Sequence, residues 1–199
     1  MMRKKLIFEK KFWKFFKKVL QLFILLQYFI HNCIMFPLGF GMMRLPVKNG
    51  NQTDFDYETL NKMVDDFLDA WFTYFDTSYV YHDGKRQEAV FKALVERHPR
   101  SSYTVATKFP TFFLKPESEF ESLFQSQLDT LGLEYINYYL IHDIQTYEYD
   151  SIDGKEGYVA SSHIFDHAKK WKEQGKIKHL GFSFHSSAKL LDKVLSEHP

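Results

Sequence analysis

Four proton-handling side chains stand at or near the ends of short apolar runs in this chain. Asp76 and Tyr81 belong to one run, Lys108 ends the next, and His142 ends a third. The runs recur about every thirty residues, which is the length of one βαβ unit. A barrel enzyme collects its catalytic groups at one face in this way, because its strands end there. The spacing therefore predicts that the four side chains share one site that handles protons.

The elements that must position these residues alternate between strand-like and helix-like patterns. We predict strands near 38–43, 72–76, 102–107, 136–141 and 178–183, and helices near 56–69, 85–97, 117–131, 161–174 and 186–196. Such alternation is typical of an α/β fold with a parallel sheet. A complete (β/α)₈ barrel takes about 250 residues, so the stretch 37–199 suffices for about five of its eight units. We therefore expect a partial barrel with two exposed strand edges and an incomplete enzyme.

Several motifs resemble the aldo-keto reductase family from about Pro37 to Pro199. They are the stretches 37–46 (PLGFGMMRLP), 75–84 (FDTSYVYHDG), 106–108 (ATK), 128–133 (LDTLGL), 140–143 (LIHD) and 175–185 (GKIKHLGFSFH). The resemblance implies a (β/α)₈ barrel that reduces carbonyls with NADPH. It also implies that Asp76, Tyr81, Lys108 and His142 form the catalytic tetrad.

The residue sequences of these motifs look most like those of a bacterial branch of the family, whose longer members often end in a ferredoxin-like segment. Cys33 is the single cysteine here, which excludes an intramolecular disulfide and any four-cysteine cluster within this chain. A [4Fe–4S] segment would therefore belong only to a longer relative.

Each tetrad residue has a role that its chemistry supports. Reduction by hydride needs a proton donor beside the developing alkoxide, and the resemblance assigns this role to Tyr81. A phenol has a pKa of about 10, and a neighbouring cation such as Lys108 favours its phenolate. Asp76 would hold that ammonium, and His142 would hydrogen-bond the substrate oxygen. Taken singly, each of the four residues also fits a structural explanation: Asp76 a turn, Tyr81 a rim aromatic, Lys108 a solvated lysine and His142 a structural histidine. Their order along successive strands favours one shared site.

The resemblance also implies cofactor contacts. Gly41, Met42 and Met43 would line the nicotinamide end together with Asp76, and Ser183 would bind the carboxamide. Relatives often carry Ser-Asn where this chain has Ser183-Phe184. The expected cofactor is NADPH, and its choice over NADH rests on analogy with the family. The expected substrate is a small aldehyde or ketone.

Residues 1–36 fall outside the resemblance and have a different composition. The first 18 residues carry a net charge of +7, in a chain whose formal total is +1, and an apolar stretch follows at 19–30. We expect a mis-started or foreign segment, with a membrane-surface helix or anchor as an alternative and a cleaved export signal as another. The near-neutral total gives no reason to expect nucleic acid as a partner. The lone cysteine and the absence of a convincing export signal favour the cytoplasm.

Two other functions fit part of the pattern. A metal-assisted barrel hydrolase would use Asp76, His142 and Asp143, and a truncated non-catalytic product would associate through its exposed strand edges. His163 and His167 lie four residues apart, as metal ligands do, but the sequence offers no third ligand. We therefore expect no metal site, and oxidoreductase activity remains the main prediction.

Overall fold

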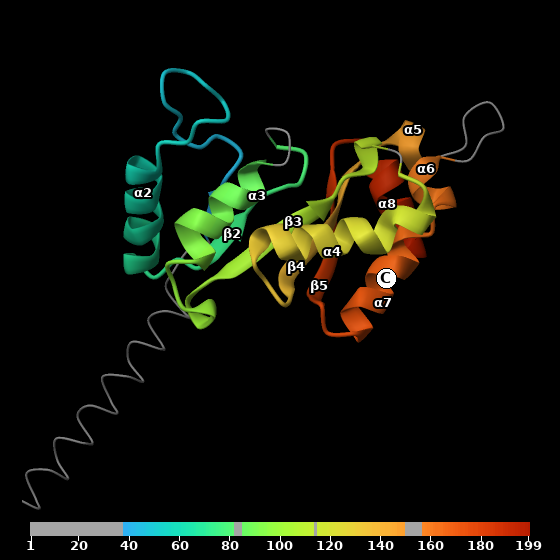
Figure 1. Ribbon diagram of the computed structural model, residues 1–199. Coiled ribbons are helices and arrows are strands. Elements are labelled where there is room, and N and C mark those ends of the chain that lie inside the picture. Colours follow the sequence, from blue (N-terminus) through green and yellow to red (C-terminus); the bar gives the residue numbers. More distant parts are fainter. Residues whose placement is uncertain (1–37, 82–84, 114, 150–156) are drawn as a thin grey trace, which may run out of the picture. The chain divides into compact units, whose positions relative to one another are not determined.

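The computed structural model of the chain describes residues 38–81, 85–113, 115–149 and 157–199 (Figure 1). Gly39–Pro199 forms one compact unit, which is described here by itself. The predicted extension at 1–36 and the motif residues 82–84 lie outside the described residues.

A five-stranded parallel sheet forms the centre of this unit. Its strands are β1 (Gly39–Gly41), β2 (Tyr74–Asp76), β3 (Thr104–Phe109), β4 (Ile136–Ile144) and β5 (Ile177–Phe184). They are hydrogen-bonded in the order β1-β2-β3-β4-β5, and every pair is parallel. A doubly wound sheet reverses its strand order near the middle, whereas a (β/α)₈ barrel adds each strand beside the last. The observed order confirms the predicted partial barrel and its five strands.

Helices connect the strands. The main ones are α2 (Tyr57–Asp69), α3 (Lys85–Val90) with its π-helical continuation η1 (Phe91–Val95), α4 (Phe120–Leu131), α7 (Ile164–Glu173) and α8 (Ala188–Glu197). Short turns of helix occur at η2 (Arg100–Ser102), η3 (Thr111–Phe113), η4 (Glu117–Glu119), α5 (Thr146–Tyr149) and α6 (Tyr158–Ser161). The five main helices match the prediction, whereas α5 and α6 were missed because each is only four residues long. No helix among the described residues is both long and apolar enough to cross a bilayer.

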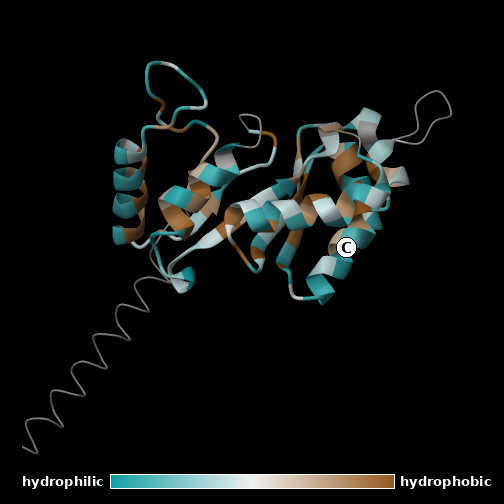
Figure 2. Ribbon diagram, in the orientation of Figure 1, coloured by the Kyte–Doolittle hydropathy of each residue, from teal (hydrophilic) through white to brown (hydrophobic). Residues whose placement is uncertain are grey.

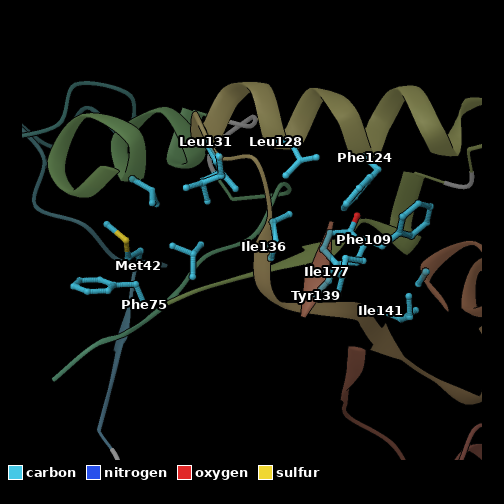
Figure 3. Close-up of a cluster of buried hydrophobic side chains, with 14 of the residues drawn as sticks. Met42, Phe75, Phe109, Phe124, Leu128, Leu131, Ile136, Tyr139, Ile141 and Ile177 are labelled. Carbon is cyan, nitrogen blue, oxygen red and sulfur yellow. The ribbon is translucent and has the colours of Figure 1, made fainter. Parts of the chain in front are cut away.

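The core lies between the sheet and the helices that cover it. Figure 2 shows apolar residues along one side of α2 and hydrophilic residues along the other. In α4, Phe124, Leu128 and Leu131 are buried and point toward the strands (Figure 3). Phe124 stacks on Trp171 of α7, with ring centroids 4.2 Å apart. Each such buried side chain contributes about 1.5–3 kcal/mol, so this layer holds the strands in register.

The end of α4 depends on a glycine. Gly132 caps the helix with φ +64°, a left-handed conformation that suits a residue without Cβ. A Cβ added here would lie 2.6 Å from the Phe91 ring. This close approach packs the end of α4 against η1 and fixes where the chain turns into β4.

Strand register brings the predicted site residues to one face. Asp76 pairs with Ala106, two residues before Lys108, and Lys108 pairs with Leu140, two residues before His142. Side chains two positions apart on a strand point to the same face. Asp76, Lys108 and His142 therefore project from the same side of the sheet, near the carboxyl ends of successive strands.

Candidate active site

A buried ion pair lies at the centre of the site. The Lys108 ammonium donates to Asp76 Oδ1 at 2.7 Å and to the Thr77 carbonyl at 2.8 Å. The Lys108 side chain is only 6% exposed, whereas that of Asp76 is 30% exposed. The ammonium has therefore lost most of its water, and the carboxylate and carbonyl replace it.

Tyr81 packs against two other members of the predicted tetrad. Lys108 Nζ lies 5.6 Å from the centre of the Tyr81 ring. The ring meets that of His142 edge-on, with centroids 6.1 Å apart and an interplanar angle of 83°. The structure therefore brings together Asp76, Tyr81, Lys108 and His142, as their spacing in the sequence predicts.

His142 is a buried and neutral histidine. The Nδ1 atom of its ring lies 3.2 Å from the Ser78 hydroxyl, and His142 as a whole is 9% exposed. Burial first, and then the nearby Lys108 charge, lower the pKa of His142 to about 4, while the Asp143 charge opposes the shift. At pH 7 the ring is therefore uncharged, with one N–H donor and one acceptor nitrogen.

Buried polar side chains fix the backbone beside these residues. Gln127 of α4 donates to the Lys108 carbonyl at 2.9 Å and accepts from the Tyr139 hydroxyl at 2.5 Å. Thr111 donates to the His142 carbonyl at 2.7 Å. Sequence reasoning missed all three supporting residues. One signal was available, because Gln127 interrupts the apolar stripe of α4 and a buried amide needs partners.

The residues expected to contact a cofactor lie in different environments. Gly41 ends β1, and a Cβ added there would meet no atom within 4 Å, which leaves open space in front of it. Met43 is 52% exposed. The Met42 side chain is fully buried in the hydrophobic core and does not line an open nicotinamide site (Figure 3), while its amide donates to the Asp76 carbonyl at 2.8 Å.

Ser183 lies on β5 at the same edge of the sheet. Its Oγ accepts from the Asp143 amide at 2.7 Å, which leaves the hydroxyl hydrogen to be donated elsewhere. A hydroxyl donor on one side of the site and open space at Gly41 on the other fit the amide and the flat ring of a nicotinamide.

A cavity opens beside Tyr81. Its volume is about 600 Å³. Apolar side chains supply most of its wall, and three polar ones complete it: the lining residues are Met43, Arg44, Leu45, Val47, Gln52, Val80 and Tyr81. The predicted proton donor therefore faces a space large enough for a small organic substrate.

The structure gives little support to the hydrolase alternative. Asp76, one of its three expected ligands, is bound to the Lys108 ammonium. Elsewhere, His163 and His167 both contact Glu117, at 3.4 and 2.7 Å. In the part of the chain that the structure describes, no group of three or more His, Cys, Asp or Glu side chains is arranged to hold a metal ion.

Comparison with known proteins gives one family. The model of the aldo/keto reductase family matches residues 37–199. Among solved structures, an aldo-keto reductase from Bacillus halodurans, in its holo form, is 23% identical with a TM-score of 0.59. An aldo/keto reductase from Brucella melitensis is also 23% identical, with a TM-score of 0.58. An aldo-keto reductase from Klebsiella pneumoniae, solved in complex with NADPH, is 19% identical with a TM-score of 0.54.

These alignments cover most of this chain but only part of the others. They include 80%, 81% and 73% of the chain, and 49%, 53% and 44% of the respective structures. The chain thus spans about half the length of the solved structures it matches. At these identities the likeness shows the fold, which agrees with the five sequential parallel strands.

Proposed function

The chain belongs to the aldo/keto reductase family, and on that premise we propose that residues 37–199 carry the catalytic face of an NADPH-dependent oxidoreductase. The reaction is the reduction of an aldehyde or ketone to an alcohol. The observation that carries the proposal is the buried Lys108 ammonium, held by Asp76 at 2.7 Å and lying 5.6 Å from the centre of the Tyr81 ring. A desolvated cation beside a phenol is costly to maintain, and its charge favours the phenolate, which supports a role for Tyr81 in proton donation.

Tyr81 is the proposed proton donor. When bound, NADPH supplies the hydride that reduces the carbonyl carbon. The carbonyl oxygen then gains negative charge and takes the proton from the Tyr81 hydroxyl. The Lys108 ammonium stabilises the phenolate that remains, and Asp76 keeps the ammonium in place.

His142 is the proposed second donor to the substrate oxygen. Because its pKa lies at about 4, the ring is neutral at pH 7 and adds no second positive charge beside Lys108. In the proposal the Ser78 hydroxyl donates to Nδ1, which leaves the hydrogen on Nε2. That N–H stabilises the charge that develops on the oxygen and orients the carbonyl toward Tyr81.

Three residues are proposed to hold the nicotinamide end of the cofactor. The Ser183 hydroxyl donates to the carboxamide oxygen, Gly41 leaves room for the ring, and Met43 contributes an apolar contact. The NADPH complex of the Klebsiella pneumoniae relative supports the choice of this cofactor. The substrate partner is a small carbonyl compound, and the cytoplasm is the proposed location.

The test is Tyr81→Phe, which removes the hydroxyl and keeps the ring against His142. We expect carbonyl reduction to fall by at least about a hundredfold, because general acid catalysis contributes that much. NADPH binding, followed by tryptophan fluorescence, should stay within about twofold of the wild-type value, since the deleted hydroxyl belongs to the proton-transfer step.

Tyr79→Phe is the matched control. Tyr79 lies two residues away, and its ring meets Phe113 rather than the tetrad. It should retain wild-type turnover. Wild-type activity in Tyr81→Phe would contradict the assigned donor, and a folded chain that binds no NADPH would contradict the cofactor.

A further inference from the structure

The cavity beside Tyr81 contains a positive charge that the proposed chemistry does not use. Arg44 is the charged residue among the described residues that line it, and Tyr81 lines the same space. Four apolar side chains form the remaining wall together with Gln52. Such a space suits a molecule with an apolar body and one polar or charged end.

Arg44 is available to bind an anion. It is exposed, and no ion pair or hydrogen bond of its guanidinium occurs within the described part of the chain. A guanidinium presents five N–H donors in a planar fork that matches a carboxylate, and it stays charged at all physiological pH values.

The other positive charge of the site cannot take this role as readily. Lys108 is 5% exposed and is already bound to Asp76 and to the Thr77 carbonyl. His142 is neutral at pH 7 because burial lowers its pKa to about 4. An anionic group that enters the cavity is therefore attracted mainly to Arg44.

The backbone holds Arg44 close to the catalytic residues. Two positions before it, the Met42 amide donates to the carbonyl of Asp76 at 2.8 Å. Directly after it, Leu45 is only 7% exposed and belongs to the core. These anchors fix the backbone on both sides of Arg44, so ligand binding does not need to order the main chain there.

We propose that Arg44 selects carbonyl substrates that also carry an anionic group, a carboxylate being the best match. The anion binds the guanidinium while the carbonyl lies at Tyr81, and the apolar wall covers the carbon skeleton between them. This inference rests on the proposed reductase function, and it concerns the class of substrate rather than the chemical step.

The test compares 3-formylbenzoate with its methyl ester, which has the same ring and aldehyde but no charge. We expect the wild-type chain to show a kcat/KM about fivefold higher for the acid, the size of a solvent-accessible ion pair, and a smaller ratio at high salt. Arg44→Met should bring the ratio close to one. Lys48→Met is the control, because Lys48 is an exposed cation in the same segment that does not line the cavity, and it should keep the wild-type ratio.

A binding measurement separates this inference from the proposed function. Calorimetry with the two corresponding alcohols, in the presence of NADP, needs no turnover. Tighter binding of the acid that disappears in Arg44→Met would support the inference even if neither aldehyde were reduced. Reduction of both aldehydes with equal kcat/KM would overturn the inference and leave the proposed function intact. The same conclusion would follow if Arg44→Met weakened NADPH binding while the kcat/KM ratio of acid to ester stayed high. Absence of both turnover and differential binding would overturn both.

Discussion

The two members of the buried ion pair should make unequal contributions to stability. Lys108 and Asp76 share one contact of 2.7 Å, but their side chains are 6% and 30% exposed. Asp76→Asn leaves an almost fully buried ammonium with only neutral partners. Lys108→Met leaves a carboxylate that water can still reach. We therefore expect Asp76→Asn to be the more destabilising change.

The magnitudes follow from these environments. Removing one partner of a buried pair costs about 3–5 kcal/mol, and we expect about 3 kcal/mol for Asp76→Asn because the Thr77 carbonyl still accepts from the ammonium. For Lys108→Met we expect about 1–2 kcal/mol, since hydration compensates the carboxylate and methionine fills the apolar part of the space. In the double variant, the loss in the free energy of unfolding should be about 1–2 kcal/mol smaller than the sum of the two single losses.

Urea denaturation followed by tryptophan fluorescence and by circular dichroism measures these free energies. The control is the exposed pair of Lys62 and Asp66, which lie 2.6 Å apart with side chains 75% and 64% exposed. Lys62→Met and Asp66→Asn should each leave the urea midpoint almost unchanged, because solvent screens an exposed ion pair. Equal costs for the two buried substitutions, or a larger cost for Lys108→Met, would refute the argument from burial.

Two further predictions concern the residues around the pair. The pKa of His142 is lowered to about 4, so the unfolded chain binds more protons than the folded one between about pH 4 and 6.5. The free energy of unfolding should therefore rise with pH across this window, by up to about 3 kcal/mol in total. Urea titrations at several pH values measure this rise, and His142→Asn should flatten it. Tyr139→Phe removes the donor to Gln127 Oε1 inside the core and should cost about 1–3 kcal/mol, so an unchanged urea midpoint would contradict the buried hydrogen bond.

The fold was predictable because its signals are local. Each predicted strand overlaps an observed one, and the alternation of strands with helices is sufficient to predict a parallel sheet. The short helices α5 and α6 were not predicted, since four residues carry no measurable period. Neither was the π-helical turn η1, which begins at Phe91, whose ring packs closely against Gly132. That contact joins residues 41 positions apart, and no local pattern encodes it.

The site was predictable only in part. The sequence positions of Asp76, Tyr81, Lys108 and His142 predict their convergence, because parallel strands end at one edge. The burial of Met42 was not predicted, since neighbouring methionines look alike in sequence, whereas in the structure Met42 is buried and Met43 is 52% exposed. The lowered pKa of His142 was not predictable either. It depends on burial and on the distance to the Lys108 charge across the sheet, and both exist only in the folded chain.

The lowered pKa of His142 also explains how the site separates its two basic groups. Asp76 contacts Lys108 directly, so the lysine carries the positive charge of the site. His142 hydrogen-bonds a neutral serine instead, and the lysine charge disfavours its protonation. A second positive charge would compete for Asp76 and weaken its hold on the ammonium. In the proposed mechanism, the lysine would stabilise the phenolate and the histidine would serve as a neutral hydrogen-bond donor, a combination that suits proton transfer to an alkoxide.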